Sequence, residues 1–145
     1  MFPAPKNVIA IIPISKTNGA TATGELIDTK GWDFVNIGIV ASTADVVSNT
    51  LSVLKIEEGD TTSSVATFTG AVSGTDYTIA TNAYTTTTNQ NVWSFNVDLR
   101  GRKRYLRVSA SPQTTMVIGA VATLMRGEQA PATAAQAGAL NAIYV

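Results

Sequence analysis

The 145-residue sequence predicts an all-β fold of the sandwich, jelly-roll or barrel kind. β-Branched and aromatic residues recur in short runs separated by Gly, Asn, Asp, Ser or Pro, and this spacing is typical of short strands joined by turns. No window before residue 130 combines helical periodicity with a capped start and stop, and Thr-rich, β-branched sequence forms helices poorly. The length fits one domain.

The clearest expected strand covers residues 92–99. Its apolar residues alternate with Ser, Asn and Asp, and the apolar set is Trp93, Phe95, Val97 and Leu99. Because period-two alternation predicts a strand with one buried face, we expect these four side chains to point into the core.

A second strand is expected over residues 32–40, after a turn at residues 28–31 (DTKG). Trp32 and Phe34 share one face, whereas the next apolar residues, from Val35 on, have the opposite parity. A change of parity of this kind predicts a β-bulge.

The remaining strands are expected where β-branched runs lie between turn residues. They cover residues 8–14, 23–27, 51–57, 65–69, 77–80, 104–110 and 116–125. The polar run at residues 85–91 is expected to be a surface loop that reverses the chain.

The two ends of the chain differ from its middle. Pro3 and Pro5 hold the first segment extended, and residues 127–140 are rich in Ala, Gln, Gly and Pro before an apolar ending. We therefore expect three regions: an N-terminal arm (1–7), a β-sandwich domain (8–126) and a C-terminal arm (127–145). The arms are expected to lie on a neighbouring subunit or a larger partner, with an apolar anchor made by Ile143, Tyr144 and Val145.

Charged residues make up only 14% of the chain, and ten basic residues balance ten acidic ones. A surface of neutral polar residues is common in proteins that pack into large assemblies, because a neutral group that finds a partner costs less to desolvate than a charge. The apolar run at residues 8–12 ends at Pro13 and is too short for a signal-peptide core or a membrane span. We expect a soluble, unprocessed chain.

The sequence offers few groups for catalysis. It has no His and no Cys, which removes the commonest general base, the commonest metal ligand and all thiol chemistry. Glu57, Glu58 and Asp60 are candidates for a carboxylate pair or part of a calcium site, but Glu-Glu-Gly-Asp after a strand is typical of a solvated turn. Ser15 and Lys16 are neighbours in a strand and point to opposite faces. We expect a protein without catalytic residues, cofactor or metal.

The main charge feature is a basic cluster at residues 100–107. It holds five of the ten basic residues: Arg100, Arg102, Lys103, Arg104 and Arg107. The balanced net charge and the single aromatic neighbour, Tyr105, argue against direct nucleic-acid binding. Because Arg pairs with carboxylates in bidentate geometry, we expect the cluster to contact an acidic protein surface. The alternative is a solvated hairpin turn whose Arg stems pack on the sheet.

Three motifs carry a resemblance to a known group. They are residues 25–35 (ELIDTKGWDFV), 54–60 (LKIEEGD) and 102–109 (RKRYLRVS). With these motifs in this order, residues 24–126 resemble small virion proteins encoded near the major capsid protein of tailed bacteriophages. Trp32 stands where a smaller aromatic residue is usual in that group, and the Ala-rich C-terminal segment has no counterpart there.

The resemblance implies a capsid decoration (cement) protein with a jelly-roll-like β-sandwich. Such a protein assembles as a homotrimer, binds the major capsid protein on the assembled phage head and stabilises the contacts between capsomers. The implied location is the capsid surface of the virion, with the host cytoplasm during assembly, and no membrane is involved. Fold analogy alone does not establish this function.

Two other function classes remain open: a virion-surface module that binds a host glycan or protein, and a hydrolase with unrecognised chemistry. A glycan binder exposes aromatic side chains in loops, whereas Trp32, Trp93 and Phe95 lie in strand patterns. Tyr84, beside the Thr-rich loop, is the exception.

Overall fold

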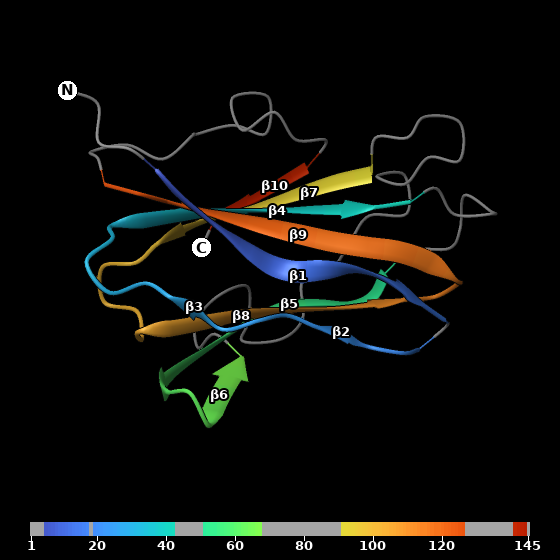
Figure 1. Ribbon diagram of the computed structural model, residues 1–145, viewed down its shortest axis with the longest axis horizontal. Coiled ribbons are helices and arrows are strands. Elements are labelled where there is room, and N and C mark those ends of the chain that lie inside the picture. Colours follow the sequence, from blue (N-terminus) through green and yellow to red (C-terminus); the bar gives the residue numbers. More distant parts are fainter. Residues whose placement is uncertain (1–4, 18, 43–50, 68–90, 127–140, 145) are drawn as a thin grey trace.

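The computed structural model describes residues 5–17, 19–42, 51–67, 91–126 and 141–144. These residues form ten strands and no helix, arranged in two layers (Figure 1). Sheet A has the order β1 (Lys6–Lys16), β9 (Met116–Met125), β4 (Phe34–Ala41), β7 (Asn91–Asp98) and β10 (Asn141–Tyr144). Sheet B has the order β2 (Ala22–Thr23), β8 (Tyr105–Pro112), β5 (Leu51–Thr61) and β6 (Ser64–Thr67), and β3 (Ile27–Asp28) also pairs with β8. The expected all-β sandwich is confirmed.

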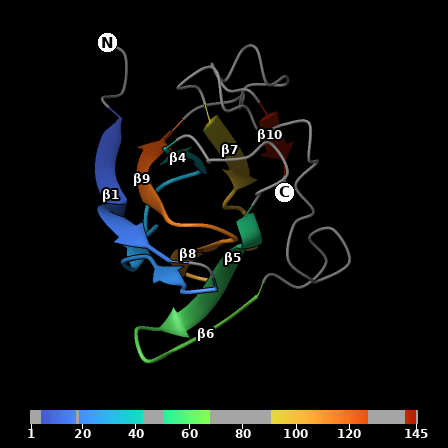
Figure 2. The same ribbon diagram turned by 90° about the vertical axis from the view of Figure 1, so that its right-hand side faces the viewer.

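Neighbouring strands pair antiparallel in both sheets, except β10, which runs parallel to β7. β4 is paired along its whole length on both sides, so that Ile37 lies opposite Ala122 of β9 and Phe95 of β7. Figure 2 shows the strands of sheet A following one another around one side and β8, β5 and β6 around the other.

The hydrophobic core lies between the two sheets. Trp93, Phe95 and Val97 have no exposed surface and Leu99 has 8%, so the inward face expected for residues 92–99 is confirmed. Side chains from both sheets pack with them, including Ile37, Ile39, Leu54, Ile56, Leu106, Val108, Ile118 and Leu124.

The turn expected at residues 28–31 is confirmed. The Lys30 N–H donates a hydrogen bond to Asp28 Oδ1 at 3.1 Å, and the Trp32 N–H donates to the Thr29 carbonyl oxygen at 3.1 Å. Gly31 has a φ of 83°, a conformation that favours glycine.

The β-bulge expected within residues 32–40 is absent. β4 begins at Phe34 and pairs with β7 and β9 without a register shift. Trp32 precedes the strand and packs against the core from the turn. The change of parity therefore marks the start of the strand and not an irregularity inside it.

Residues 57–60 are not the solvated turn that the sequence suggested. They belong to β5, and Glu57 and Glu58 are only 8% and 9% exposed. Burial of two adjacent carboxylates requires partners, and the rest of the fold supplies them.

The chain closes the sandwich at one edge through Gly24. The Gly24 N–H donates to the carbonyl oxygen of Val108 in β8 at 2.7 Å, and the Glu25 N–H donates to the carbonyl oxygen of Ala10 in β1 at 2.8 Å. A Cβ at position 24 would collide with both carbonyl oxygens. The absence of a side chain lets one backbone segment join both sheets here.

The two terminal arms are not confirmed. Lys6 and Asn7 already belong to β1, and residues 141–144 pair with β7 of the same chain. The expected strand at 23–27 is split into β2 and β3. The last residue of the loop expected at 85–91, Asn91, belongs to β7. The rest of that loop, the expected strand at 77–80 and the segment 127–140 lie outside the described residues.

Candidate protein-interaction surface

The basic cluster lies where the chain leaves β7 and enters β8, a connection that crosses from sheet A to sheet B and is not a hairpin. Each of its five cationic side chains meets a carboxylate of the same chain. The pairs are Arg100–Asp98 (2.6 Å), Arg102–Glu58 (3.9 Å), Lys103–Asp60 (3.7 Å), Arg104–Asp28 (2.7 Å) and Arg107–Glu57 (2.9 Å). The concentration of charge seen in the sequence is thus balanced locally in the fold.

Two of these pairs are bidentate and exposed. Arg104 donates from Nε to Asp28 Oδ1 at 2.9 Å and from Nη2 to Oδ2 at 2.7 Å. The hydrogen bond from Arg104 lowers the pKa of Asp28 from 3.8 to about 2, and the hydrogen bond from Arg100 lowers the pKa of Asp98. The same contacts raise the pKa of both guanidinium groups.

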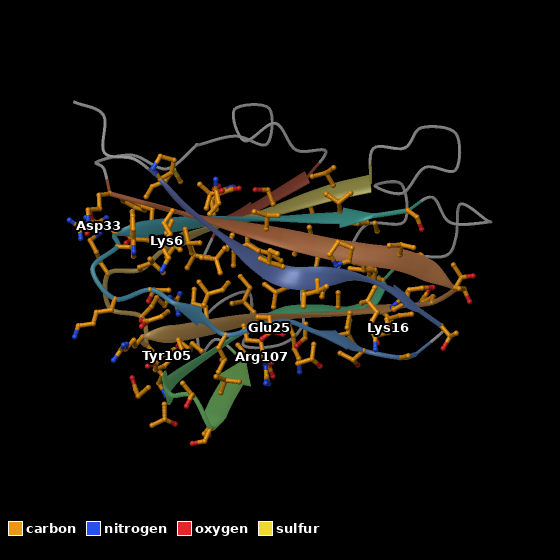
Figure 3. All side chains as sticks on the ribbon, viewed as in Figure 1. Lys6, Lys16, Glu25, Asp33, Tyr105 and Arg107 are labelled. Atoms are coloured by element: carbon orange, nitrogen blue, oxygen red, sulfur yellow. The ribbon has the colours of Figure 1, made fainter. Side chains whose placement is uncertain are left out.

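Glu57 is the centre of a network on the outer face of sheet B. Its Oε2 accepts hydrogen bonds from Arg107 Nε at 2.9 Å and from the Ser109 hydroxyl at 3.2 Å, and Lys55 Nζ lies 3.5 Å from Oε1. Figure 3 shows Arg107 on this lower layer of the sandwich. Two cations and a hydroxyl compensate the burial of this carboxylate.

Glu58 points the opposite way and holds the connection between β7 and β8. Its Oε2 accepts a hydrogen bond from the Lys103 N–H at 3.2 Å, while Oε1 faces Arg102. The Arg102 and Glu58 side chains are 21% and 11% exposed. Part of the basic cluster therefore has a structural role inside its own domain.

The expected C-terminal anchor is described only by its backbone. Ile143 and Tyr144 lie in β10, opposite Phe95 and Asn96 of β7, and Val145 lies outside the described residues. The interface roles of these residues and of the basic cluster stay predictions.

Sequence reasoning missed a different surface, on the outside of sheet A. Ile9, Val40, Val117 and Val121 are between 47% and 54% exposed, and strand register places them on one side of β1, β9 and β4. Together with the small or cyclic residues between them they form what we call the apolar face: Ile9, Pro13, Gly38, Val40, Val117, Gly119 and Val121.

The apolar face carries no charge. β4 and β9 contain no ionisable residue, and β1 has only Lys6 and Lys16 at its two ends, where Figure 3 shows them. The neighbouring outward positions are neutral as well: Thr123 donates to Asn7 at 2.9 Å. The ionic residues of the described chain gather on sheet B and at the ends of the sandwich.

A hollow of about 450 Å³ lies in the middle of the apolar face, lined by Ile9, Pro13, Gly38, Val40, Gly119 and Val121 among others. Two of these positions are glycines, and the absence of their side chains creates the hollow between the projecting Ile9, Val40 and Val121 side chains. A Cβ at Gly38 would meet nothing nearer than a carbonyl oxygen at 4.0 Å, whereas at Gly119 it would press on the Pro13 ring at 3.2 Å.

One signal for this face was present in the sequence. The segments 8–14 and 116–122 are apolar at almost every position, whereas a strand with one solvated face alternates. When a strand is apolar on both faces, one face packs in the core and the other is left on the outside of the sheet, where a partner can cover it.

No cluster of acidic residues that fits a metal ion occurs in the described part of the chain, and that part has no helix able to span a membrane. Comparison with known proteins found no matching family model, no matching curated protein and no matching solved structure.

Proposed function

We propose that this chain is a structural virion protein: a capsid decoration (cement) protein that binds the major capsid protein of an assembled phage head and stabilises the contacts between capsomers. The proposal joins the sequence resemblance to one structural observation, the uncharged apolar face on the outside of sheet A. Assembly removes such a face from water and so lowers the free energy of the chain. Contiguous exposed apolar surface of this kind marks interaction sites.

The exposed apolar surface favours an assembly protein over a free monomer. Burying an aliphatic side chain of this size contributes roughly 1.5–3 kcal/mol, and Ile9, Val40 and Val121 are each about half exposed. A partner that covers the face recovers part of this free energy. A protein that binds the assembled shell better than its separated parts stabilises the shell by mass action.

Strand pairing supports the jelly-roll form of the sandwich. The pairs β1–β9, β2–β8, β4–β7 and β5–β6 are all antiparallel, as in one long hairpin whose closed end is β5–β6. Wrapping that hairpin adds the contacts β4–β9 and β5–β8. Double-sheet jelly rolls of eight strands occur in viral capsid proteins and also in lectin domains, so this form fits the proposed function without excluding a glycan binder.

The described residues offer no comparable observation for the glycan-binding alternative, and its candidate Tyr84 lies outside them. Trp93 and Phe95 are fully buried and Trp32 is partly buried against the core, so these rings are not a platform for sugar stacking. The location on the capsid surface stays a prediction of the same proposal. Self-assembly does too, and the homotrimer is the form of it that the resemblance implies.

The test is reconstitution on bare shells. Purified protein is added to empty shells of the major capsid protein that lack it, and bound protein is measured after sedimentation. We expect saturable binding at a copy number comparable with that of the capsid protein, and shells that resist heat or low salt better. No binding, or a few copies per particle, would contradict the proposal.

A further inference from the structure

We propose that the apolar face binds the apolar face of a second copy of this chain about a two-fold axis, so that the working unit is a face-to-face dimer in place of the homotrimer that the sequence resemblance implies. This inference rests on the proposed function only in treating the apolar face as an assembly surface. It adds the identity of the partner and the symmetry of the contact.

The apolar face matches itself chemically. β4 and β9 bring no charge to it, so no partner charge is needed to cover it. Burying an unpaired charge of another protein against it would be costly. Among the described residues the large exposed aliphatic side chains lie on β1, β4 and β9 alone. Ile12 and Ile14 of β1 border a separate hollow together with Lys16, Thr23 and Glu25. The exposed aliphatic side chains that share one uncharged face are Ile9, Val40, Val117 and Val121.

The shape of the apolar face is also complementary to itself. Val121 lies between Ile9 of β1 and Gly38 of β4, and Gly119 lies opposite Val40. Projecting side chains thus border a hollow whose floor is glycine. A two-fold axis through the hollow sets the Val40 and Val121 side chains of each copy against the hollow of the other. An isologous contact requires a self-complementary surface, and projecting side chains beside a hollow provide one.

The area around the apolar face is large enough for a weak dimer. The outer surface of β1, β9 and β4 over the ten residues of β9, at about 3.3 Å per residue and about 4.8 Å per strand, is roughly 500 Å², and the apolar face is its central part. Two copies that cover this whole surface bury about 1,000 Å², which lies at the lower bound for a specific interface. The contact suits a dimer that forms in the micromolar range and is reinforced on a shell, where local concentration is high.

Pairing through the strand edge is a poorer route for the same strands. β1 is an edge strand of sheet A, but its pairing is interrupted by register shifts between Ile9 and Ile11 and between Ile11 and Ile14. Pro13 removes a backbone donor from the same stretch. Bulges and proline are devices that protect edges, so association is directed to the face.

The first experiment measures oligomeric state by analytical ultracentrifugation across a concentration series. We expect a monomer–dimer equilibrium for the wild type. Val121→Lys should weaken it at least about 100-fold, because the two-fold contact buries two added charges near each other. Thr61→Lys is the matched control: it adds the same charge at an exposed end of β5 in sheet B and should leave the dimer unchanged. Circular dichroism establishes that both variants fold.

The second experiment tests the symmetry directly. The chain has no Cys, so Val121→Cys introduces a single thiol, and in a two-fold contact that thiol faces its own counterpart. A short bis-maleimide should give covalent dimers and no larger species, whereas Thr61→Cys should not cross-link. In a head-to-tail contact position 121 meets a different residue, and the reagent yields no dimer.

A wild type that stays monomeric at high concentration would overturn the inference. So would a trimer that survives Val121→Lys, or equal cross-linking from positions 61 and 121. These outcomes are separate from failure of the proposed function. A dimer that ignores bare shells contradicts the cement role alone, and shell binding by a monomer contradicts the dimer alone.

Discussion

Glu57 and Arg107 lie directly opposite each other in the antiparallel pair β5–β8, and Nε and Nη2 of Arg107 both lie 2.9 Å from Glu57 Oε2. The pair joins the motif at residues 54–60 to the motif at residues 102–109. Two segments that are about fifty residues apart in the sequence thus form one charged network on sheet B.

We predict that Arg107→Met destabilises the domain by about 2–4 kcal/mol, because it leaves a buried carboxylate with Lys55 as its remaining cation. Urea denaturation measures the loss. Arg100→Met is the control, since the Arg100–Asp98 pair is exposed and exposed pairs contribute little. Adding Glu57→Gln to Arg107→Met should restore part of the stability. Equal effects of the two Arg variants would show that Glu57 is effectively solvated.

The same substitution, Gly→Ala, can be compared at Gly24 and at Gly38. We predict that Gly24→Ala destabilises the domain by at least about 2 kcal/mol, because its Cβ collides with two backbone carbonyl oxygens, of Ala10 and Val108, that cannot move independently. Gly38→Ala has room for its Cβ and should leave the unfolding free energy nearly unchanged or raise it slightly. Thermal melts of both variants decide the point. If Gly24→Ala melts like the wild type, the two sheets are not joined tightly there.

The core and the turns of this fold are readable from sequence because they depend on local pattern. The alternation of Trp93, Phe95 and Val97 predicts their inward face, and Asp28 to Gly31 predicts the turn. The burial of Glu57 and Glu58 is not readable in this way, because it depends on cations some fifty residues away that strand pairing brings beside them. An ion pair leaves no periodic pattern in the sequence, whereas a strand with one buried face does.

In the candidate site, too, some features follow from local sequence pattern and others depend on tertiary contacts. The basic cluster is visible as sequence, but its neutralisation by Asp28, Glu58 and Asp60 depends on tertiary contacts. The apolar face is hidden for another reason. In β9 both parities are apolar, so the pattern does not tell which face is covered by sheet B and which is left outside.

Acid should weaken the link between β3 and β8. The pKa of Asp28 is lowered from 3.8 in the unfolded chain to about 2 in the fold, so its contribution is complete above pH 3.8 and is lost as the pH falls toward 2. The pKa of Asp98 is lowered in the same direction. The effect should be small, because both carboxylates are exposed and screened by solvent.

The measurement is the urea midpoint between pH 2 and pH 6. Asp28→Asn should lower the midpoint at pH 6 and flatten its fall below pH 4, while leaving the midpoint at pH 2 close to that of the wild type. A variant whose acid profile parallels the wild type would show that other carboxylates set the pH dependence.

The basic cluster allows a test of its expected role at an interface. We predict that changing Arg102, Lys103 and Arg104 together to Ser lowers stability, because Glu58, Asp60 and Asp28 lose their partners. Shell binding should fall less than the number of removed charges suggests, and its salt dependence should be shallow, since the charges are already paired within the chain. Binding that collapses in a folded variant, with a steep salt dependence in the wild type, would instead show that the cluster contacts the capsid directly.

The final prediction concerns residues 141–145, expected from sequence to be part of an arm on a neighbour. In the structure Asn141 to Tyr144 pair with Trp93 to Asn96 of β7, so deletion of residues 141–145 should leave a folded protein with a lower melting temperature. The deletion also exposes the backbone donors and acceptors of β7 as a sheet edge, and open edges promote aggregation. Thermal melts followed by light scattering test both effects. A separate variant that lacks residues 1–4 controls for the loss of a chain end. If the deletion leaves melting unchanged but abolishes shell binding, the segment acts on a neighbour, as the sequence suggested, and its pairing with β7 contributes no stability.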